Sequence, residues 1–154
     1  LDLNKDDTLF DLYSGVGTIG IFLSDTVKEV YGIEIEEEAV EMANKNIALN
    51  NVINCEYIAG PAEEKAIEFK NRNIKPDVIV VDPPRKGLDE RCIQYILDFK
   101  PKKIGYISCN PATLVRDLKA LEKDYDIKEI TPVDMFPYTR TCGVCNSDAF
   151  KIIN

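Results

Sequence analysis

A glycine-rich segment at residues 11–20 has the composition and spacing of a cofactor-binding loop. It follows a predicted strand, opens a predicted helix and carries Gly15, Gly17 and Gly20. Glycines allow a tight turn and the close approach of a ligand to the backbone. Glu34 ends the next predicted strand, where a carboxylate can accept hydrogen bonds from both ribose hydroxyls of a nucleotide. The loop fits either a nicotinamide dinucleotide or S-adenosylmethionine, and a glycine turn without a ligand is the plainer alternative.

A second carboxylate, Asp82, closes the fourth predicted strand. The apolar run 78–81 leads into it, and Pro83 and Pro84 follow. Prolines restrict the backbone, so the Asp82 carboxylate is expected to be held at the edge of the sheet. A dehydrogenase does not need a carboxylate there; the alternative is that Asp82 only caps the next turn. Arg85 and Lys86 come next and could contact phosphates, although such residues are often merely solvated.

Cys109 is a candidate nucleophile because of its position. It lies in a predicted turn between a strand and the helix that Pro111 begins. A thiolate attacks, a thiol does not, and the N-terminus of a helix favours the thiolate. An inert core cysteine is the alternative.

The candidate residues are positioned by strands and helices that alternate along the chain. This alternation predicts an α/β fold with a mostly parallel, doubly wound sheet. The predicted strands are 8–12, 29–34, 55–59, 77–82, 104–108 and 127–133, and the predicted helices are 17–23, 36–50, 62–72, 90–99 and 111–123. Ligands of such sheets bind outside the carboxyl ends of the strands. The candidate residues all lie directly after strands, and we therefore expect them at one edge.

The composition limits the function. The 154 residues carry a net charge of −8, so the chain alone should bind RNA weakly, because phosphate attraction supplies most non-specific affinity. No apolar run is long enough to span a membrane. Five cysteines in a domain with a normal core suggest free thiols and a cytoplasmic location. The first residue is Leu1, so we expect a domain cut from a longer polypeptide, with RNA-binding modules upstream.

Three ordered segments, residues 82–87, 108–118 and 133–139, resemble the motifs of the RNA 5-methyluridine methyltransferase family. The resemblance implies a Rossmann-like S-adenosylmethionine-dependent methyltransferase fold. It also implies that Tyr13, Glu34 and Asp82 bind S-adenosylmethionine and that Cys109 attacks carbon 6 of a uracil in RNA, which activates carbon 5 for methylation. The family has further parts upstream: an RNA-binding β-barrel, a glutamine that contacts the cofactor and, in some members, an iron–sulfur cluster.

The sequence departs from the family near its end. There the family continues with one variable residue and then His-Val-Glu, whose glutamate removes the proton from carbon 5. In this chain Arg140 is followed by Thr141, Cys142 and Gly143, and there is no histidine at all. We therefore expect this step to be impaired.

A frameshift of one nucleotide between about Thr139 and Thr141 would explain the departure. With suitable codons, the segment that begins at Thr141 yields His-Val-Glu-Cys-Val-Ile when it is translated one nucleotide later. The present tail contains Gly, Asn, Ser and Asp, which are poor strand residues. We therefore predict a damaged final antiparallel strand between strands five and six, with pairing limited to Ala149–Ile153. Cys142 and Cys145 lack the other ligands of a zinc site, and no metal is expected.

The sequence thus predicts a methyltransferase domain at 1–140 and a divergent tail at 141–154. The leading function is methylation of uracil carbon 5 in RNA. An amino or ribose methyltransferase, in which Cys109 is incidental, is a second possibility. A non-catalytic S-adenosylmethionine- or RNA-binding remnant is a third, and a nicotinamide-dependent dehydrogenase is the most distant.

Overall fold

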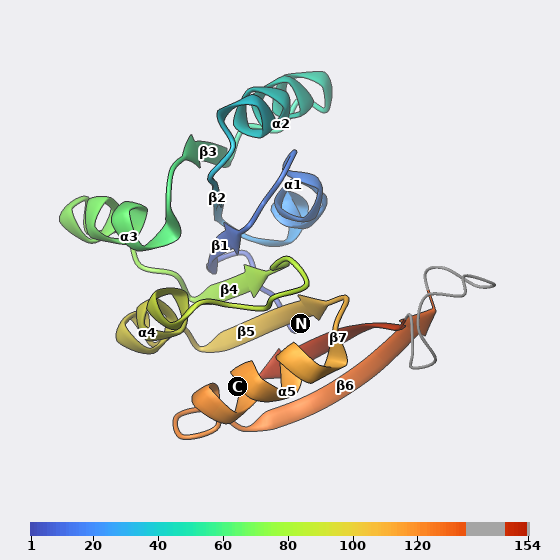
Figure 1. The fold of residues 1–154 in the computed structure, drawn as a ribbon. Coiled ribbons are helices and arrows are strands. Elements are labelled where there is room, and N and C mark those ends of the chain that lie inside the picture. The colour runs from blue at the N-terminus through green and yellow to red at the C-terminus, as the bar shows by residue number, and fades with distance from the viewer. Residues whose placement is uncertain (135–146, 154) are drawn as a thin grey trace.

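The computed structural model describes residues 1–134 and 147–153. Within these ranges one sheet has the strand order β3-β2-β1-β4-β5-β7-β6 (Figure 1). Strands β1 to β5 are parallel, and β7 runs antiparallel to both β5 and β6. The strands are β1 (Thr8–Leu12), β2 (Glu29–Glu34), β3 (Cys55–Ala59), β4 (Val78–Val81), β5 (Lys103–Ser108), β6 (Ile127–Asp134) and β7 (Ser147–Ile153).

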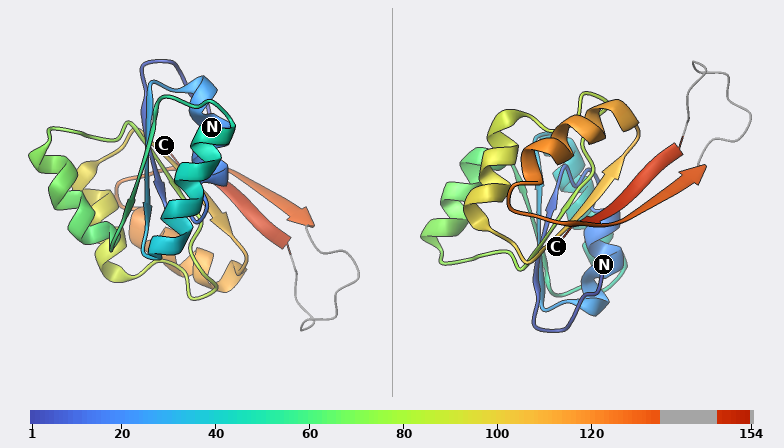
Figure 2. Two further views of the ribbon diagram at one scale, coloured as in Figure 1. Left: turned by 90° about the horizontal axis from the view of Figure 1, so that it is seen from above. Right: turned by 90° about the horizontal axis from the view of Figure 1, so that it is seen from below.

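Helices cover both faces of the sheet (Figure 2). On one face lie α1 (Thr18–Leu23) and α2 (Glu37–Leu49), and on the other lie α3 (Ala62–Asn71), α4 (Glu90–Phe99) and α5 (Pro111–Leu121). A short 3₁₀ helix, η1 (Ser24–Thr26), follows α1 and was not predicted from the sequence. The doubly wound fold is confirmed, and the predicted strand bounds differ from the observed ones by at most one residue.

The core is built on the two faces of the central strands. All five residues of β1 are buried, as is typical of a parallel strand with helices on both sides. Phe10 and Leu12 pack toward α3 and α4, where the Phe10 ring lies 4.8 Å from the Phe69 ring, centroid to centroid. Leu9 packs with Val78 on the opposite face. The strand ends that carry the candidate residues are therefore fixed by the most buried part of the molecule.

The final strand inserts between β5 and β6, as predicted. Its ladder with β5 covers the predicted Ala149–Ile153, but its ladder with β6 continues to Ser147, which pairs with Asp134. Over residues 147–153 the predicted damage is limited to one register shift in the ladder with β6, between Ile127 and Glu129. Backbone pairing with β6 outweighs the weak strand propensity of Ser147 and Asp148, which the ladder with β5 does not reach. Residues 142–146, to which the prediction of damage also applies, lie outside the described residues.

Candidate active site

The glycine loop leaves β1 in a conformation that glycine favours. Gly15 and Gly17 have φ values of 52° and 83°, and Tyr13 also has a positive φ, 61°. Non-glycine residues rarely adopt this left-handed conformation, and where they do the site is often functional. The loop is closed by a hydrogen bond from the Gly17 amide to the Ser14 carbonyl, 2.9 Å long. Tyr57 of β3 supports it from below, since its hydroxyl donates to the Gly17 carbonyl over 3.1 Å.

Glu34 ties this loop to the end of β2. One carboxylate oxygen accepts a hydrogen bond from the Gly15 amide at 2.8 Å. The other accepts from the amides of Ile35 and Glu36 at 2.7 and 3.2 Å. The carboxylate is thus held in one orientation by the backbone, and it retains lone-pair capacity for a ligand hydroxyl.

Asp11 lies beneath the glycine loop and was not singled out from the sequence. It is fully buried, and one of its oxygens accepts a hydrogen bond from the Gly20 amide at 2.9 Å. The other oxygen has no hydrogen-bond partner among the described residues. Burial raises the pKa of Asp11 to about 7, the Gly20 amide opposes this rise, and the charges of Asp82 and Glu34 add to it. The only sequence signal was an acidic residue inside an otherwise apolar strand.

A pocket of about 540 Å³ opens at the carboxyl edge of the sheet. It brings together three of the predicted site residues, Tyr13, Glu34 and Asp82. Gly15 and Gly17 belong to the adjoining loop and are not among its lining residues. Sequence reasoning missed the contribution from the end of β3, although the carboxyl end of a parallel strand could have indicated it. The other lining residues, none of which was predicted from the sequence to contact a cofactor, are Ile33, Ile35, Gly60, Pro61, Ala62, Pro84, Lys86 and Asp89.

Cys109 is exposed in the turn between β5 and α5. The turn is rigidly built: the Ser108 hydroxyl accepts from the Asn110 amide at 3.1 Å and donates to the Asn110 carbonyl at 3.0 Å. The Asn110 side chain caps α5 by accepting from the Ala112 amide, and donates to the Arg85 carbonyl at 3.0 Å. Cys109 does not line the pocket, but its turn is bonded to the loop that begins at Asp82.

The other described cysteines are not suited to nucleophilic chemistry. Cys92 is buried and Cys55 is half-buried. Burial raises the pKa of the Cys55 thiol to about 11, and the nearby Asp11 charge adds to this rise. Cys142 and Cys145 lie outside the described residues. Among the cysteines that the structure describes, Cys109 alone is exposed.

Comparison with known proteins identifies the family. A sequence profile of tRNA (uracil-5-)-methyltransferases matches residues 2–147. This chain belongs to the tRNA (uracil-5-)-methyltransferase family. An uncharacterised RNA methyltransferase of Streptococcus mutans is 52% identical over 139 residues, which make up 90% of this chain and 31% of that relative. Another, from Lactobacillus johnsonii, is 53% identical over the same shares of the two chains. The chain spans less than a third of these relatives.

Solved structures agree with the family. The tRNA (uracil-54, C5)-methyltransferase of Pyrococcus abyssi, in complex with S-adenosyl-L-homocysteine, is 35% identical and superposes with a TM-score of 0.79 over 99% of this chain and 35% of its own. M. capricolum TrmK, also in complex with S-adenosyl-homocysteine, has a TM-score of 0.73 over 99% of this chain and 64% of its own. At 17% identity the TrmK match shows a shared fold only.

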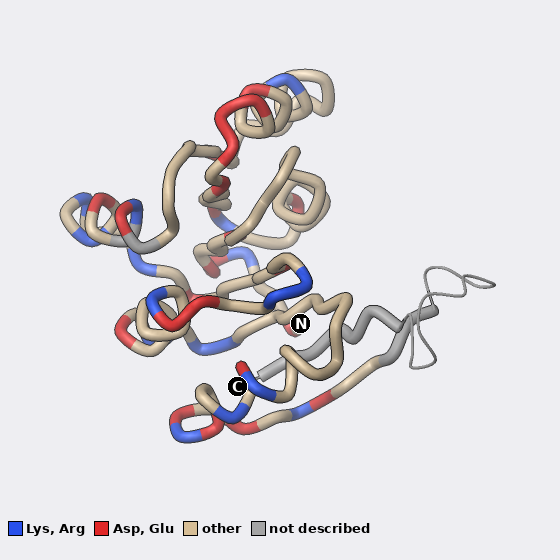
Figure 3. The backbone as a smooth tube through the Cα atoms, in the orientation of Figure 1, with Lys and Arg blue, Asp and Glu red and all other residues tan. Residues whose placement is uncertain are grey.

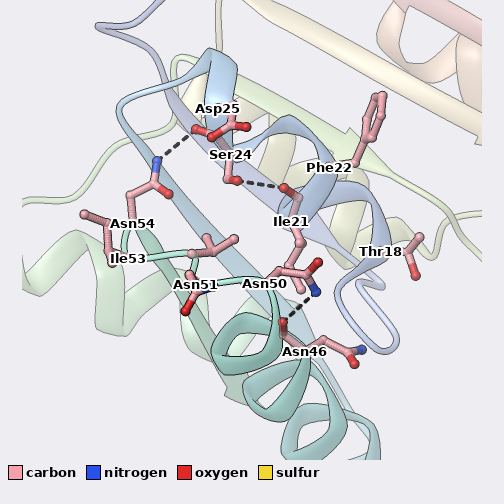
Figure 4. A pocket seen from close by; sticks show the side chains of 11 residues that line it. Thr18, Ile21, Phe22, Ser24, Asp25, Asn46, Asn50, Asn51, Ile53 and Asn54 are labelled. Carbon is pink, nitrogen blue, oxygen red and sulfur yellow. Dashed lines mark hydrogen bonds between the residues drawn. The ribbon is translucent and has the colours of Figure 1, made fainter.

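A second pocket, of about 600 Å³, lies between α1, η1 and the end of α2 (Figure 4). Its asparagine amides serve the fold: Asn50 donates to the Asn46 carbonyl, and Asn54 donates to the Ser24 carbonyl. The exposed Phe22 ring turns away from these asparagines. None of the residues predicted from the family motifs lines this pocket.

The described residues offer neither a metal site nor a membrane span. Within residues 1–134 and 147–153, no three His, Cys, Asp or Glu side chains are grouped so that they could hold a metal ion. None of the helices in the described ranges could cross a lipid bilayer. Gly143, the position at which the resemblance predicts a glutamate, and the proposed frameshift site lie outside the described residues.

Proposed function

We propose that this chain transfers the methyl group of S-adenosylmethionine to carbon 5 of a uracil in RNA, with Cys109 as the nucleophile. The observation that carries the proposal is the position of Cys109. It is exposed at the same sheet edge as the pocket, in a turn hydrogen-bonded to the loop that begins at Asp82. The family and its Pyrococcus abyssi structure, named for methylation of a tRNA uracil, support the choice of substrate.

The pocket fits S-adenosylmethionine in size and chemistry. Its volume lies within the range of about 300–1,000 Å³ that is typical of small-molecule sites. Ile33, Ile35 and Ala62 line the pocket and would offer apolar contact to an adenine, while Glu34 would accept hydrogen bonds from the ribose hydroxyls. Asp82, which lines the same pocket, would bind the methionine end. The cofactor supplies an electrophilic methyl group on a sulfonium.

The chemistry assigned to Cys109 solves a problem of reactivity. Carbon 5 of uracil is a poor nucleophile. When the Cys109 thiolate forms a bond to carbon 6, the electron pair of the carbon 5–carbon 6 double bond moves into an enolate. Carbon 5 then forms its bond to the methyl group as the methyl–sulfur bond breaks, and the sulfur keeps that electron pair as S-adenosylhomocysteine leaves. A base removes the proton from carbon 5, and the electron pair of that carbon–hydrogen bond restores the double bond and expels the thiolate.

The base is the missing group in this sequence, because Gly143 has no side chain that could remove a proton. This observation favours a second candidate function, a catalytically dead protein that still binds S-adenosylmethionine or RNA. In a chain without this base the Cys109 thiolate could still add to carbon 6 and the methyl group could still be transferred to carbon 5. Because the proton on carbon 5 could not be removed, the methylated RNA would stay bound as a covalent adduct. We assign the activity to residues 1–140 and regard 141–154 as a divergent tail, although its last strand completes the sheet.

The test is to incubate the chain with uridine-containing RNA and methyl-labelled S-adenosylmethionine, and to separate the products on a denaturing gel. We expect a labelled protein–RNA band in the wild type and none in C109A. The half-buried Cys55 provides the control, and C55A should retain the band. Free 5-methyluridine formed equally by C109A and the wild type would contradict the role of Cys109, and a band absent from every protein that still binds the cofactor would favour the dead alternative.

A further inference from the structure

Asp117 of α5 is a buried carboxylate that the proposed chemistry does not use. It is fully buried, and one oxygen accepts hydrogen bonds from the Leu88 amide at 2.8 Å and the Tyr106 hydroxyl at 2.6 Å. The other oxygen accepts from Arg116, whose Nε and Nη2 lie 2.8 and 2.7 Å away. A buried carboxylate is costly unless its charge is paired and its lone pairs are used, and here both conditions are met.

Arg116 extends this contact to the loop at residues 82–88, which we call the 82–88 loop. Its Nη2 donates to the carbonyls of Lys86 and Leu88 at 2.9 and 3.0 Å. Between them Gly87 has a φ of 77°, and a Cβ atom there would lie 2.5 Å from the Asp117 carboxylate. The loop backbone is therefore packed directly on the Arg116–Asp117 pair, with no room for a side chain at Gly87.

The N-terminus of α5 also holds the 82–88 loop, at Arg85. The Thr113 hydroxyl and the Asn110 side-chain amide both donate to the Arg85 carbonyl, at 3.2 and 3.0 Å. Helix α5 thus contacts the backbone of the 82–88 loop at successive residues. Asp82 begins this loop three residues before Arg85, and Cys109 precedes the first residue of the helix by two.

We propose that Arg116 and Asp117 are positioning residues that set the separation between Asp82 and Cys109 by holding the 82–88 loop against α5. The inference rests on the proposed function. Small errors in placement are expensive in a reaction of two bound groups, since a shift of about 1 Å can reduce the rate about 100-fold.

The experiment compares R116M, R116K and D117N with the wild type in the full chain. Arg116 has a half-exposed side chain, so its variants are expected to fold even if D117N does not. The matched control is K119M, which removes one charge from an exposed position of the same helix. The measurements are the thermal midpoint, the Kd of S-adenosylmethionine, the rate of formation of the Cys109 adduct and the amide exchange of residues 85–88.

R116M should form the adduct about 100-fold more slowly, while its Kd for S-adenosylmethionine changes by less than about threefold. R116K should be intermediate, because an ammonium can pair with Asp117 but cannot also serve both carbonyls as a planar guanidinium does. Exchange of the Leu88 amide should become faster in R116M and D117N. K119M should match the wild type throughout.

An adduct rate in R116M equal to that of K119M, with only a lower thermal midpoint, would show a purely structural pair and overturn the inference. If the wild type forms neither adduct nor product, the proposed function fails, and the exchange data then decide whether the loop is held by the pair. Unchanged exchange at Leu88 in R116M overturns the inference in that case also, and faster exchange there supports it.

Discussion

At the scale of single residues, the buried Asp11 has an environment that departs strongly from water. It has one hydrogen bond, from Gly20, and lies near the charges of Asp82 and Glu34. Burial penalises its charged form more than the single amide stabilises it. The carboxyl group that starts the glycine loop is therefore expected to be partly protonated near neutral pH.

This protonation predicts a specific dependence of stability on pH. The pKa of Asp11 is about 7 in the folded chain and 3.8 without the fold, so the folded chain holds a proton that the unfolded chain has lost between these pH values. The contribution of Asp11 to the free energy of unfolding is therefore complete below about pH 4. As the pH rises from there to about 7, the free energy of unfolding falls by at most about 4 kcal/mol. In D11N this loss should be absent.

Urea unfolding between pH 4 and 8 measures the difference between the wild type and D11N. The control is D6N, which removes an exposed carboxylate and should keep the pH dependence of the wild type. Parallel pH profiles for the wild type and D11N would show that Asp11 does not titrate in this range.

At the scale of elements, the glycine loop after β1 depends on β3, which pairs with β2 and supplies Tyr57. The buried Tyr57 ring packs over Gly32 of β2, where a Cβ atom would lie 2.0 Å from the ring. Its hydroxyl reaches the Gly17 carbonyl. The Tyr57 side chain can therefore reach from β3 across β2 to the loop after β1, because Gly32 has no side chain in its way.

Y57F should therefore weaken cofactor binding as well as stability. Loss of the hydroxyl removes one buried hydrogen bond, which is worth about 1 kcal/mol, and leaves the loop less firmly held. Tyr125 offers a matched control, because its buried hydroxyl donates to the Pro101 carbonyl at 3.1 Å, away from the pocket. Calorimetric titration with S-adenosylmethionine should show a higher Kd for Y57F than for Y125F at similar thermal midpoints. Equal Kd values would exclude a role for Tyr57 in shaping the loop.

At the scale of the whole molecule, charge is unevenly distributed. The chain has a net charge of −8, and carboxylates are concentrated at the start of α2, whereas Arg85 and Lys86 form a basic point on the loop after β4 (Figure 3). Both residues are exposed, while their backbone carbonyls are held by α5. On the proposed function, an RNA that reaches Cys109 would pass near these cations, because the turn that holds Cys109 is hydrogen-bonded to the Arg85 carbonyl.

The double variant R85Q/K86Q should therefore bind single-stranded RNA more weakly. If each residue contacts one phosphate, the slope of log K against log salt should decrease by about 1.4. Fluorescence anisotropy over a range of salt concentrations measures this slope. K119Q/K123Q, which removes the same charge from exposed positions of α5 and the turn after it, is the control. Equal losses in the two double variants would indicate a non-specific effect of net charge.

The sequence by itself determined the elements and the edge at which the site lies. Strands and helices depend on local patterns of apolar residues, glycines and prolines, and in a parallel sheet the carboxyl ends of the strands meet at one edge. The pattern of strands was therefore enough to place Tyr13, Glu34 and Asp82 at one edge, with Cys109 at the end of another strand of the same sheet.

Only the tertiary structure decided what supports these residues. The bond from Tyr57 to Gly17 joins residues 40 positions apart, and the bond from Leu88 to Asp117 joins residues 29 apart. Such contacts leave no periodic pattern in the sequence, because they depend on how finished elements pack against each other. The burial that raises the pKa of Asp11 has the same origin. An acidic residue in a strand pattern is equally compatible with a solvated position, and only the helices packed over β1 exclude water from it.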